Sequence, residues 1–240
     1  MIKVVSFRIC PFVQRVTALL EAKNVPYEIE YISLSDKPQW FLDISPNGQV
    51  PLLVTENGTA LFESDAIAEY LDDQYAPIVA DVSAEQKALD RAWTYQATKH
   101  YLVQCGTMSS KDKETFETRF EKLSKAFAKA EKYLAEANHN GPFWHGDYVS
   151  NVDMAWFVLL HRAHIVEQHS GLDFFAQFPR VKAWQQALMA TQLPESTVSD
   201  DFVEKFSNFY LSENTYLGRK LEQSCAPAEK SACSTSSCCG

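Results

Sequence analysis

Short apolar runs separated by polar turns dominate about the first 75 residues of the chain. Two runs, IKVVSF and YEIEYISL, flank a stretch with apolar residues at helical spacing from Pro11 to about Lys23. The runs VPLLV and TALF follow, and the turn between them contains Asn57-Gly58, a dipeptide typical of hairpins. Ser64 then suits the start of a helix. The pattern predicts a βαβ unit followed by ββα.

Long helical patterns replace this alternation in the second half of the chain. One example is the apolar series Phe116, Phe120, Leu123, Phe127 and Leu134, whose spacing matches one face of a helix. No credible strand interrupts these patterns. The second half is therefore predicted to be an all-α bundle.

The change in pattern predicts two domains and a tail. Residues 1–76 form an α/β domain and residues 84–212 an all-α domain, with the proline-containing stretch YAPIVADVS as the linker. Residues 213–240 end in a low-complexity, cysteine-rich segment with few apolar side chains to bury, so we expect this tail to be disordered.

A capping signal precedes an apolar segment of the second domain, in the stretch GDYVSNVDMAWF at residues 146–157. Ser150 and Asp153 have the spacing of a capping box, in which each side chain satisfies a backbone N–H of the other residue. We interpret this pair as the start of a buried helix, with no direct part in catalysis.

One cysteine lies where the first predicted strand gives way to the first predicted helix. Pro11 suits the first helical position because it has no N–H to lose, which places Cys10 at the helix N-terminus. Unpaired N–H groups and the helix dipole favour a thiolate there and lower its pKa. An inert core cysteine is the alternative, since free cysteine is among the most buried residues. The local sequence leaves both open.

Composition excludes several classes of protein. The formal net charge of −9 and the absence of a basic face argue against nucleic-acid binding. The longest apolar run, MAWFVLL, is too short to span a bilayer. Lys3 and Arg8 interrupt the continuous apolar segment that a secretory signal peptide would need at the N-terminus. Of the six cysteines, only Cys10 and Cys105 lie in the body of the chain, and the other four lie in the tail. This distribution does not suggest a framework of disulfides. A cytoplasmic protein is expected.

The residues around Cys10 resemble the glutathione transferase superfamily, most closely its omega class. The stretch RICPF with Gln14-Arg15 resembles the omega active-site segment, and KPQWF at residues 37–41 resembles a second omega segment. NGQVP at residues 47–51 resembles the loop that carries the cis-proline of thioredoxin folds. The resemblance covers about residues 2–212. It implies a thioredoxin-like N-terminal domain, an all-helical C-terminal domain, glutathione as co-substrate and a homodimer.

The resemblance also implies which residues act. Cys10 would be the catalytic residue, and glutathione would be held by Phe12, Lys37, Val50, Pro51, Glu63 and Ser64. The backbone of Val50 can pair with the cysteinyl unit of an extended peptide. Glu63 can take the α-ammonium of the γ-glutamyl group, while Ser64 and Lys37 can take the carboxylates.

The predicted activity is glutathione-dependent thiol transfer or reduction, including dehydroascorbate reduction, as in the omega class. Val13 stands where a CxxC motif has its second cysteine, so Cys10 would work as a monothiol through a mixed disulfide with glutathione. An alternative is conjugation to, or cleavage of, a hydrophobic electrophile, for which Ser6 and Tyr31 are the nearby hydroxyl candidates.

Two non-enzymatic alternatives also fit the stretch around Cys10. A chloride intracellular channel type protein has a similar stretch, but Arg15, Glu21 and Lys23 make the following helix a poor membrane span, so no stable insertion is expected. The other is a catalytically silent scaffold with weak or no glutathione binding.

The second substrate is expected to meet the helical domain around Tyr95, His100, Trp156 and Phe157, although aromatic residues at helical spacing also form cores. No metal site is expected, because the nearby histidines His161, His164 and His169 lack an HExxH motif or a cysteine at ligand spacing. For the tail cysteines we favour disorder with incidental thiol reactivity over binding of a soft metal; they are Cys225, Cys233, Cys238 and Cys239.

Overall fold

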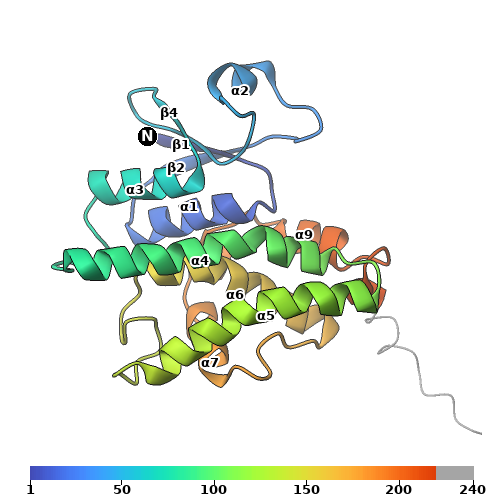
Figure 1. The fold of residues 1–240 in the computed structure, drawn as a ribbon. Coiled ribbons are helices and arrows are strands. Elements are labelled where there is room, and N and C mark those ends of the chain that lie inside the picture. The colour runs from blue at the N-terminus through green and yellow to red at the C-terminus, as the bar shows by residue number, and fades with distance from the viewer. Residues whose placement is uncertain (220–240) are drawn as a thin grey trace, which may run out of the picture.

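A four-stranded sheet forms the centre of the N-terminal domain in the computed structural model, which describes residues 1–219 (Figure 1). The strand order is β2-β1-β3-β4. Strand β1 (Ile2–Ser6) pairs in parallel with β2 (Tyr27–Tyr31) and antiparallel with β3 (Leu52–Val54), which pairs antiparallel with β4 (Ala60–Phe62). This arrangement confirms the predicted thioredoxin-like domain.

Helices cover both faces of this sheet because its strands alternate side chains between two apolar faces. Helix α1 (Pro11–Ala22) and helix α3 (Ser64–Gln74) pack together on one face. The other face is covered by α2 (Gln39–Ile44), a helix that the apolar pattern did not predict. Its Phe41 is fully buried against Val5 and Leu52.

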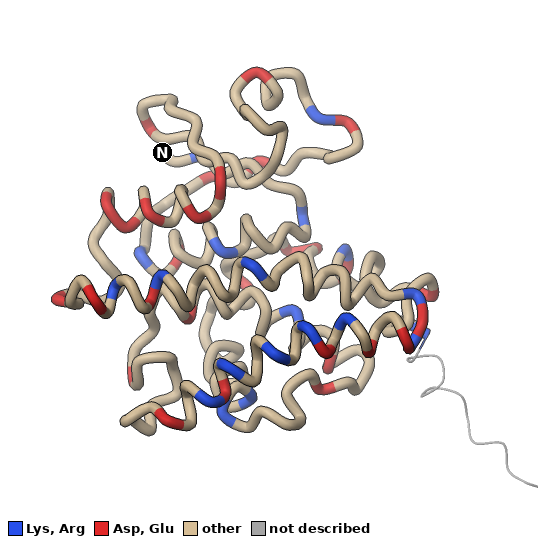
Figure 2. Tube along the Cα trace, viewed as in Figure 1, with Lys and Arg blue, Asp and Glu red and all other residues tan. Residues whose placement is uncertain are grey.

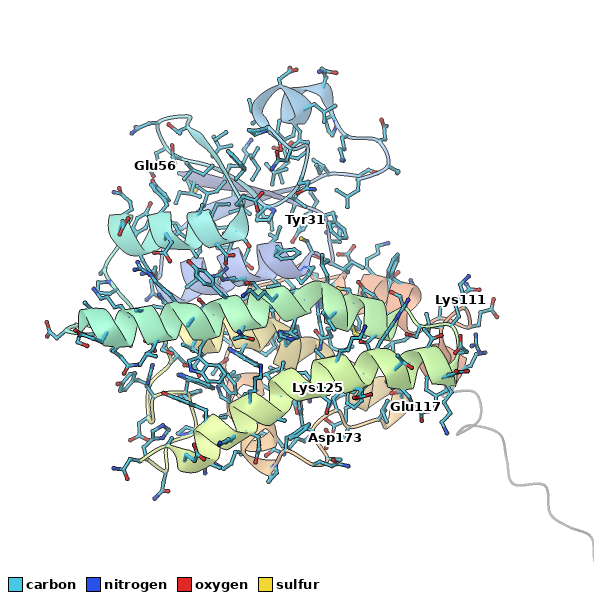
Figure 3. The ribbon with its side chains drawn as sticks, viewed as in Figure 1. Tyr31, Glu56, Lys111, Glu117, Lys125 and Asp173 are labelled. Atoms are coloured by element: carbon cyan, nitrogen blue, oxygen red, sulfur yellow. The ribbon has the colours of Figure 1, made fainter. Side chains whose placement is uncertain are left out.

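The C-terminal domain is helical, as predicted. Its long helices are α4 (Ala84–Met108), α5 (Lys113–Glu136) and α6 (Asn151–Ser170), followed by α7 (Pro179–Met189), α8 (Leu193–Ser196) and α9 (Phe202–Tyr210). Helix α4 packs against both α5 and α6 (Figure 1). Charged residues such as Glu117 and Lys125 lie along the exposed side of α5, where both signs of charge alternate (Figures 2 and 3).

A buried carboxylate fixes the start of α6. The capping box of Ser150 and Asp153 is present, with the Ser150 N–H donating to Asp153 Oδ2 over 2.8 Å. Asp153 Oδ1 also accepts from the backbone N–H of Trp144 at 3.0 Å and from Trp184 Nε1 at 2.7 Å. Burial nevertheless raises the pKa of this carboxyl. The pair therefore has the structural role expected of it.

A buried polar network joins the two domains beneath the start of α1. Gln14 Nε2 lies 2.8 Å from Nδ1 of His161 and donates to Thr197 Oγ1 at 3.2 Å, while Gln14 Oε1 accepts from Arg162. All four residues are buried. Helix α1 also packs against α6 and α8. These contacts and the polar network together hold the start of α1, and with it Cys10, in place against the helical domain.

The packed chain continues past the predicted domain boundary at residue 212. Leu217 is fully buried, and the Tyr216 N–H donates to the Ser110 carbonyl over 2.8 Å. The first residues of the expected tail thus pack against the bundle. The four tail cysteines lie outside the described residues.

Candidate active site

A cavity of about 620 Å³ lies between the two domains. From the N-terminal domain, its walls come from the start of α1, the loops before and after α2, and the junction of β4 with α3. Helices α4 and α9 close it from the helical domain. Every residue predicted to act in catalysis or to bind glutathione lines it: Cys10, Phe12, Lys37, Val50, Pro51, Glu63 and Ser64.

Cys10 occupies the N-cap position of α1. Its backbone is extended, and its carbonyl accepts the Gln14 N–H at 3.2 Å. Pro11 is the first helical residue, as predicted. The N–H groups of Phe12 and Val13 act on the sulfur and lower its pKa, which is the helix N-terminus effect expected from the sequence.

Burial outweighs this effect. Cys10 is only 6% exposed, and removal of the sulfur from water raises the pKa of the Cys10 thiol to about 11. The prediction of a lowered pKa is therefore wrong. The sequence predicted the local helix geometry correctly. It could not predict that residues distant in the sequence would bury the Cys10 sulfur.

A second positive influence on Cys10 comes from the helical domain. Arg162 of α6 is fully buried, donates to the Ile9 carbonyl at 3.3 Å and lowers the Cys10 pKa by its charge. The sequence reasoning missed Arg162. A charged residue within the apolar α6 stretch was the available signal, because such residues are rarely buried without a purpose.

The glutathione-binding candidates converge from three separate segments. The Val50–Pro51 bond is cis. Glu63 has a φ of 66°, a left-handed value that is uncommon for a residue other than glycine and that clusters at functional sites. Its Oε1 accepts from Asn47 Nδ2 at 3.2 Å, and Ser64 follows as the first residue of α3.

The residues predicted for the second substrate do not reach the cavity. Trp156 and Phe157 are both 0% exposed in the core, so that prediction is wrong for them. The hydroxyl of Tyr95 donates to Glu69 on α3 at 3.4 Å, and His100 Nδ1 lies 2.6 Å from the Gln96 carbonyl. The helical wall is formed instead by Thr98, Lys99, Leu102, Cys105 and Tyr210.

Helix geometry explains the error differently for the two residues of α4. His100 falls on another face of α4, whereas Tyr95 shares the stripe of Thr98 and Leu102 but lies nearer the helix N-terminus, where its hydroxyl meets Glu69 of α3. Leu102 follows Thr98 by four residues and Cys105 follows Leu102 by three, so the stripe continues along the wall of the cavity. Leu102 is large, apolar and exposed, so it adds apolar surface to this wall of the cavity.

The hydroxyl candidates for a conjugating enzyme lie away from the cavity. Ser6 is 2% exposed and donates to the Phe7 carbonyl at 2.8 Å. Tyr31 packs beneath the Arg8 guanidinium, 4.3 Å from the ring centroid, and burial raises its pKa. Neither residue lines the cavity, so Cys10 is its candidate nucleophile.

The comparisons with known proteins agree with this geometry. Residues 9–74 match the family described as glutathione S-transferase, N-terminal domain, and residues 99–197 match glutathione S-transferase, C-terminal domain. The chain belongs to the glutathione S-transferase family. As a member of that family it has the expected pairing of a thioredoxin-like domain with a helical domain.

Relatives of this glutathione S-transferase include omega-class and DHAR proteins. Glutathione S-transferase omega-1 of Rattus norvegicus is 32% identical over 214 residues, 88% of this chain and 85% of the relative. Glutathione S-transferase DHAR2 of Arabidopsis thaliana is 31% identical over 189 residues, 78% and 83% of the two chains. The solved glutathione transferase Omega 3C of Trametes versicolor is 25% identical with a TM-score of 0.71, covering 83% of this chain and 89% of that one.

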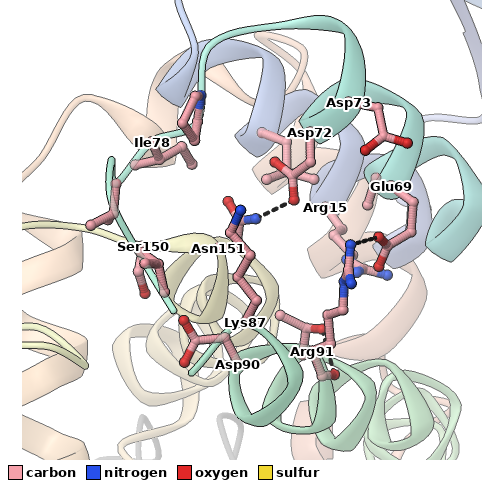
Figure 4. Close-up of a pocket in the computed structure, with 16 residues that line it drawn as sticks. Arg15, Glu69, Asp72, Asp73, Ile78, Lys87, Asp90, Arg91, Ser150 and Asn151 are labelled. Atoms are coloured by element: carbon pink, nitrogen blue, oxygen red, sulfur yellow. Dashed lines mark hydrogen bonds and ion pairs between the residues drawn. The ribbon is translucent and has the colours of Figure 1, made fainter. Parts of the chain in front are cut away.

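A second, smaller cavity of about 130 Å³ lies at the domain junction, bounded by α3, α4 and the start of α6 (Figure 4). Several of its polar and charged groups are paired with one another. Arg91 donates to Glu69, and Asn151 donates to Asp72. No cysteine is among its lining residues, so it offers no thiol for transfer.

Among residues 1–219, no three His, Cys, Asp or Glu side chains are arranged to hold a metal ion. His161 contacts Gln14 and stacks between Phe157 and Phe202, with ring centroids 5.3 and 5.6 Å away. None of the described helices has the length and apolar character needed to cross a bilayer.

Proposed function

We propose that this glutathione transferase is a thioltransferase or reductase in which Cys10 forms a mixed disulfide with glutathione. The observation that carries the proposal is the convergence of Cys10, the Val50–Pro51 loop and the Glu63-Ser64 pair on one cavity. A thiol, an extended-peptide edge and the N-terminus of α3 are the groups that a γ-linked, anionic tripeptide would engage. The omega-class and DHAR relatives support the same activity.

The raised pKa of Cys10 is compatible with this activity. At pH 7 the fraction present as thiolate is about a hundredfold lower for a thiol of pKa about 11 than for a thiol of pKa 9.0. A thiolate of higher pKa is also a stronger nucleophile, with a Brønsted slope of about 0.4 to 0.5 that restores up to about tenfold. The net loss is about tenfold. Binding the disulfide beside the sulfur contributes far more than that, because well-oriented groups react as though at about 10⁵ M or above.

The first half of the reaction needs only Cys10. Its thiolate attacks a disulfide that contains glutathione, the S–S bond breaks, and the partner thiol leaves with the proton. Val13, 2% exposed, occupies the position where a CxxC motif has its second thiol. A second glutathione returns Cys10 to the thiol by the same exchange.

Replacing Cys10 tests the proposal. Cys10→Ser should lower glutathione-coupled disulfide and dehydroascorbate reduction by at least about a hundredfold, because serine cannot form a disulfide. A matched control, Cys239→Ser, removes a tail thiol and should retain the activity. Circular dichroism and thermal unfolding should be alike in both variants. Full reductase activity in a folded Cys10→Ser protein would contradict the proposal.

We also propose that the protein is a cytoplasmic homodimer, as the family resemblance implies. One relative from Oryza sativa subsp. japonica carries "cytosolic" in its name. Sedimentation equilibrium would show a mass of twice 27.2 kDa for a dimer. A mass equal to that of one chain would contradict the dimer.

A further inference from the structure

A second thiol lines the cavity that contains Cys10. Cys105 of α4 is partly exposed and borders the same space. It lies one helical turn after Tyr101, on the same face of α4. The Tyr101 ring packs edge-on against Phe12, with centroids 5.4 Å apart, so this face of α4 is directed at the start of α1.

A buried cation that interacts with both thiols has no carboxylate partner. Arg162 is fully buried and donates to Gln14 Oε1 and to the Val158 and Ile9 carbonyls, both at 3.3 Å. Its Nε has no hydrogen-bond partner, and Arg162 forms no ion pair with any Asp or Glu among residues 1–219. An isolated buried charge is costly, so a neighbouring group that can become negative gains stability from it.

The acidic groups that interact with Arg162 are weak acids: Cys105, Tyr210, Cys10 and Tyr101. Two of them are thiols, which ionise more readily than phenols. The Tyr210 hydroxyl also contacts Cys105 through a side-chain hydrogen bond. Arg162 therefore interacts with both thiols.

Cys105 is the thiol that remains beside Arg162 once Cys10 has entered a disulfide. Both thiols border the same cavity, so a mixed disulfide on Cys10 lies in the space that Cys105 also lines. Arg162 and the Tyr210 hydroxyl are the polar neighbours of Cys105 there.

We propose that Cys105 is a resolving thiol that attacks the Cys10–glutathione mixed disulfide and forms an internal Cys10–Cys105 disulfide. The inference rests on the proposed function, which supplies the mixed disulfide. Cys105 sulfur bonds to Cys10 sulfur, the Cys10–glutathione bond breaks, and glutathione leaves with the proton from Cys105. No other oxidant takes part, and two further glutathione molecules reduce the internal disulfide to two thiols and oxidised glutathione.

The test uses the full-length chain with all four tail cysteines replaced by serine, so that only Cys10 and Cys105 can react. This parent and its Cys105→Ser and Cys105→Ala variants are incubated with stoichiometric oxidised glutathione. The samples are quenched in acid, blocked with N-ethylmaleimide and examined by intact mass and peptide mapping. Two variants are used so that a folding defect in one does not decide the outcome.

The parent should lose two hydrogens in mass and yield a cross-linked Cys10–Cys105 peptide. Its glutathione adduct should fall to about a tenth or less of that on either Cys105 variant, because an intramolecular thiol acts at a high effective concentration. Equal adducts on Cys10 in parent and variants, without the cross-link, would overturn the inference and leave the proposed function intact. No glutathione on Cys10 and no cross-link in any protein would overturn both.

Discussion

The rate at which Cys10 is alkylated, measured as a function of pH without glutathione, should show that the pKa of its thiol is strongly raised. The perturbation is pH, varied from neutral to strongly alkaline. The structure places the Cys10 pKa at about 11, against 9.0 for an ordinary thiol, because burial outweighs the N–H groups of Val13 and Phe12 and the charge of Arg162. At pH 7 the thiolate fraction is then about one in 10,000, and it rises about tenfold with each pH unit.

The assay is the second-order rate of Cys10 carboxamidomethylation by iodoacetamide, followed by peptide mapping. The rate at pH 7 should be about tenfold below that of the same peptide in denaturant, since fewer thiolates are partly offset by their greater nucleophilicity. The rate should still be rising at pH 10. Arg162→Met, which removes the buried charge, should move the midpoint higher still.

A rate that reaches its plateau below pH 8 would refute this reasoning. It would mean that the helix N-terminus and Arg162 together outweigh desolvation. A midpoint unchanged by Arg162→Met would show that the guanidinium does not act on the sulfur. The denatured protein is the internal control, because both influences vanish there.

Three further predictions concern stability and binding. Asp153→Ala leaves the buried N–H groups of Trp144 and Trp184 unpaired and should lower the free energy of unfolding by about 3 to 5 kcal/mol in urea titrations, whereas a loss under about 1 would contradict that role. Burial lowers the His161 pKa to about 3, so as the pH falls the unfolded chain takes up the proton before the folded protein does. The free energy of unfolding should therefore fall between pH 6.5 and 3 by up to about 1.4 kcal/mol per pH unit. His161→Gln should flatten this slope, and an unchanged slope would contradict this role of His161. Lys37→Met should weaken glutathione binding by about three- to tenfold in calorimetry, less so at high salt, and unchanged affinity would exclude its contact with a carboxylate.

Local signals in the sequence were sufficient for the fold and for half of the cavity. Strand alternation, Pro11 at the helix start and the Ser150–Asp153 spacing each depend on neighbouring residues, and the structure has all of them. The residues predicted to bind glutathione also come from short segments at the ends of strands and helices. Such segments converge once the topology is known.

The other half of the cavity depends on long-range packing. Which face of α4 turns toward α1 is decided by contacts such as Phe12 with Tyr101, and these lie far apart in the sequence. The aromatic stripe of α6 was a core, with Trp156 fully buried. The desolvation of Cys10 also depends on long-range packing, because residues of the helical domain help to bury its sulfur.

A crystal structure of the Cys105→Ser protein grown with oxidised glutathione would show whether Cys10 bonds to glutathione in this cavity. We expect a disulfide of about 2.05 Å between Cys10 and glutathione, with the peptide along Val50 and its γ-glutamyl end at Glu63 and Ser64. Glutathione bound elsewhere, or present in the cavity with its γ-glutamyl end turned away and Cys10 still free, would contradict this expectation.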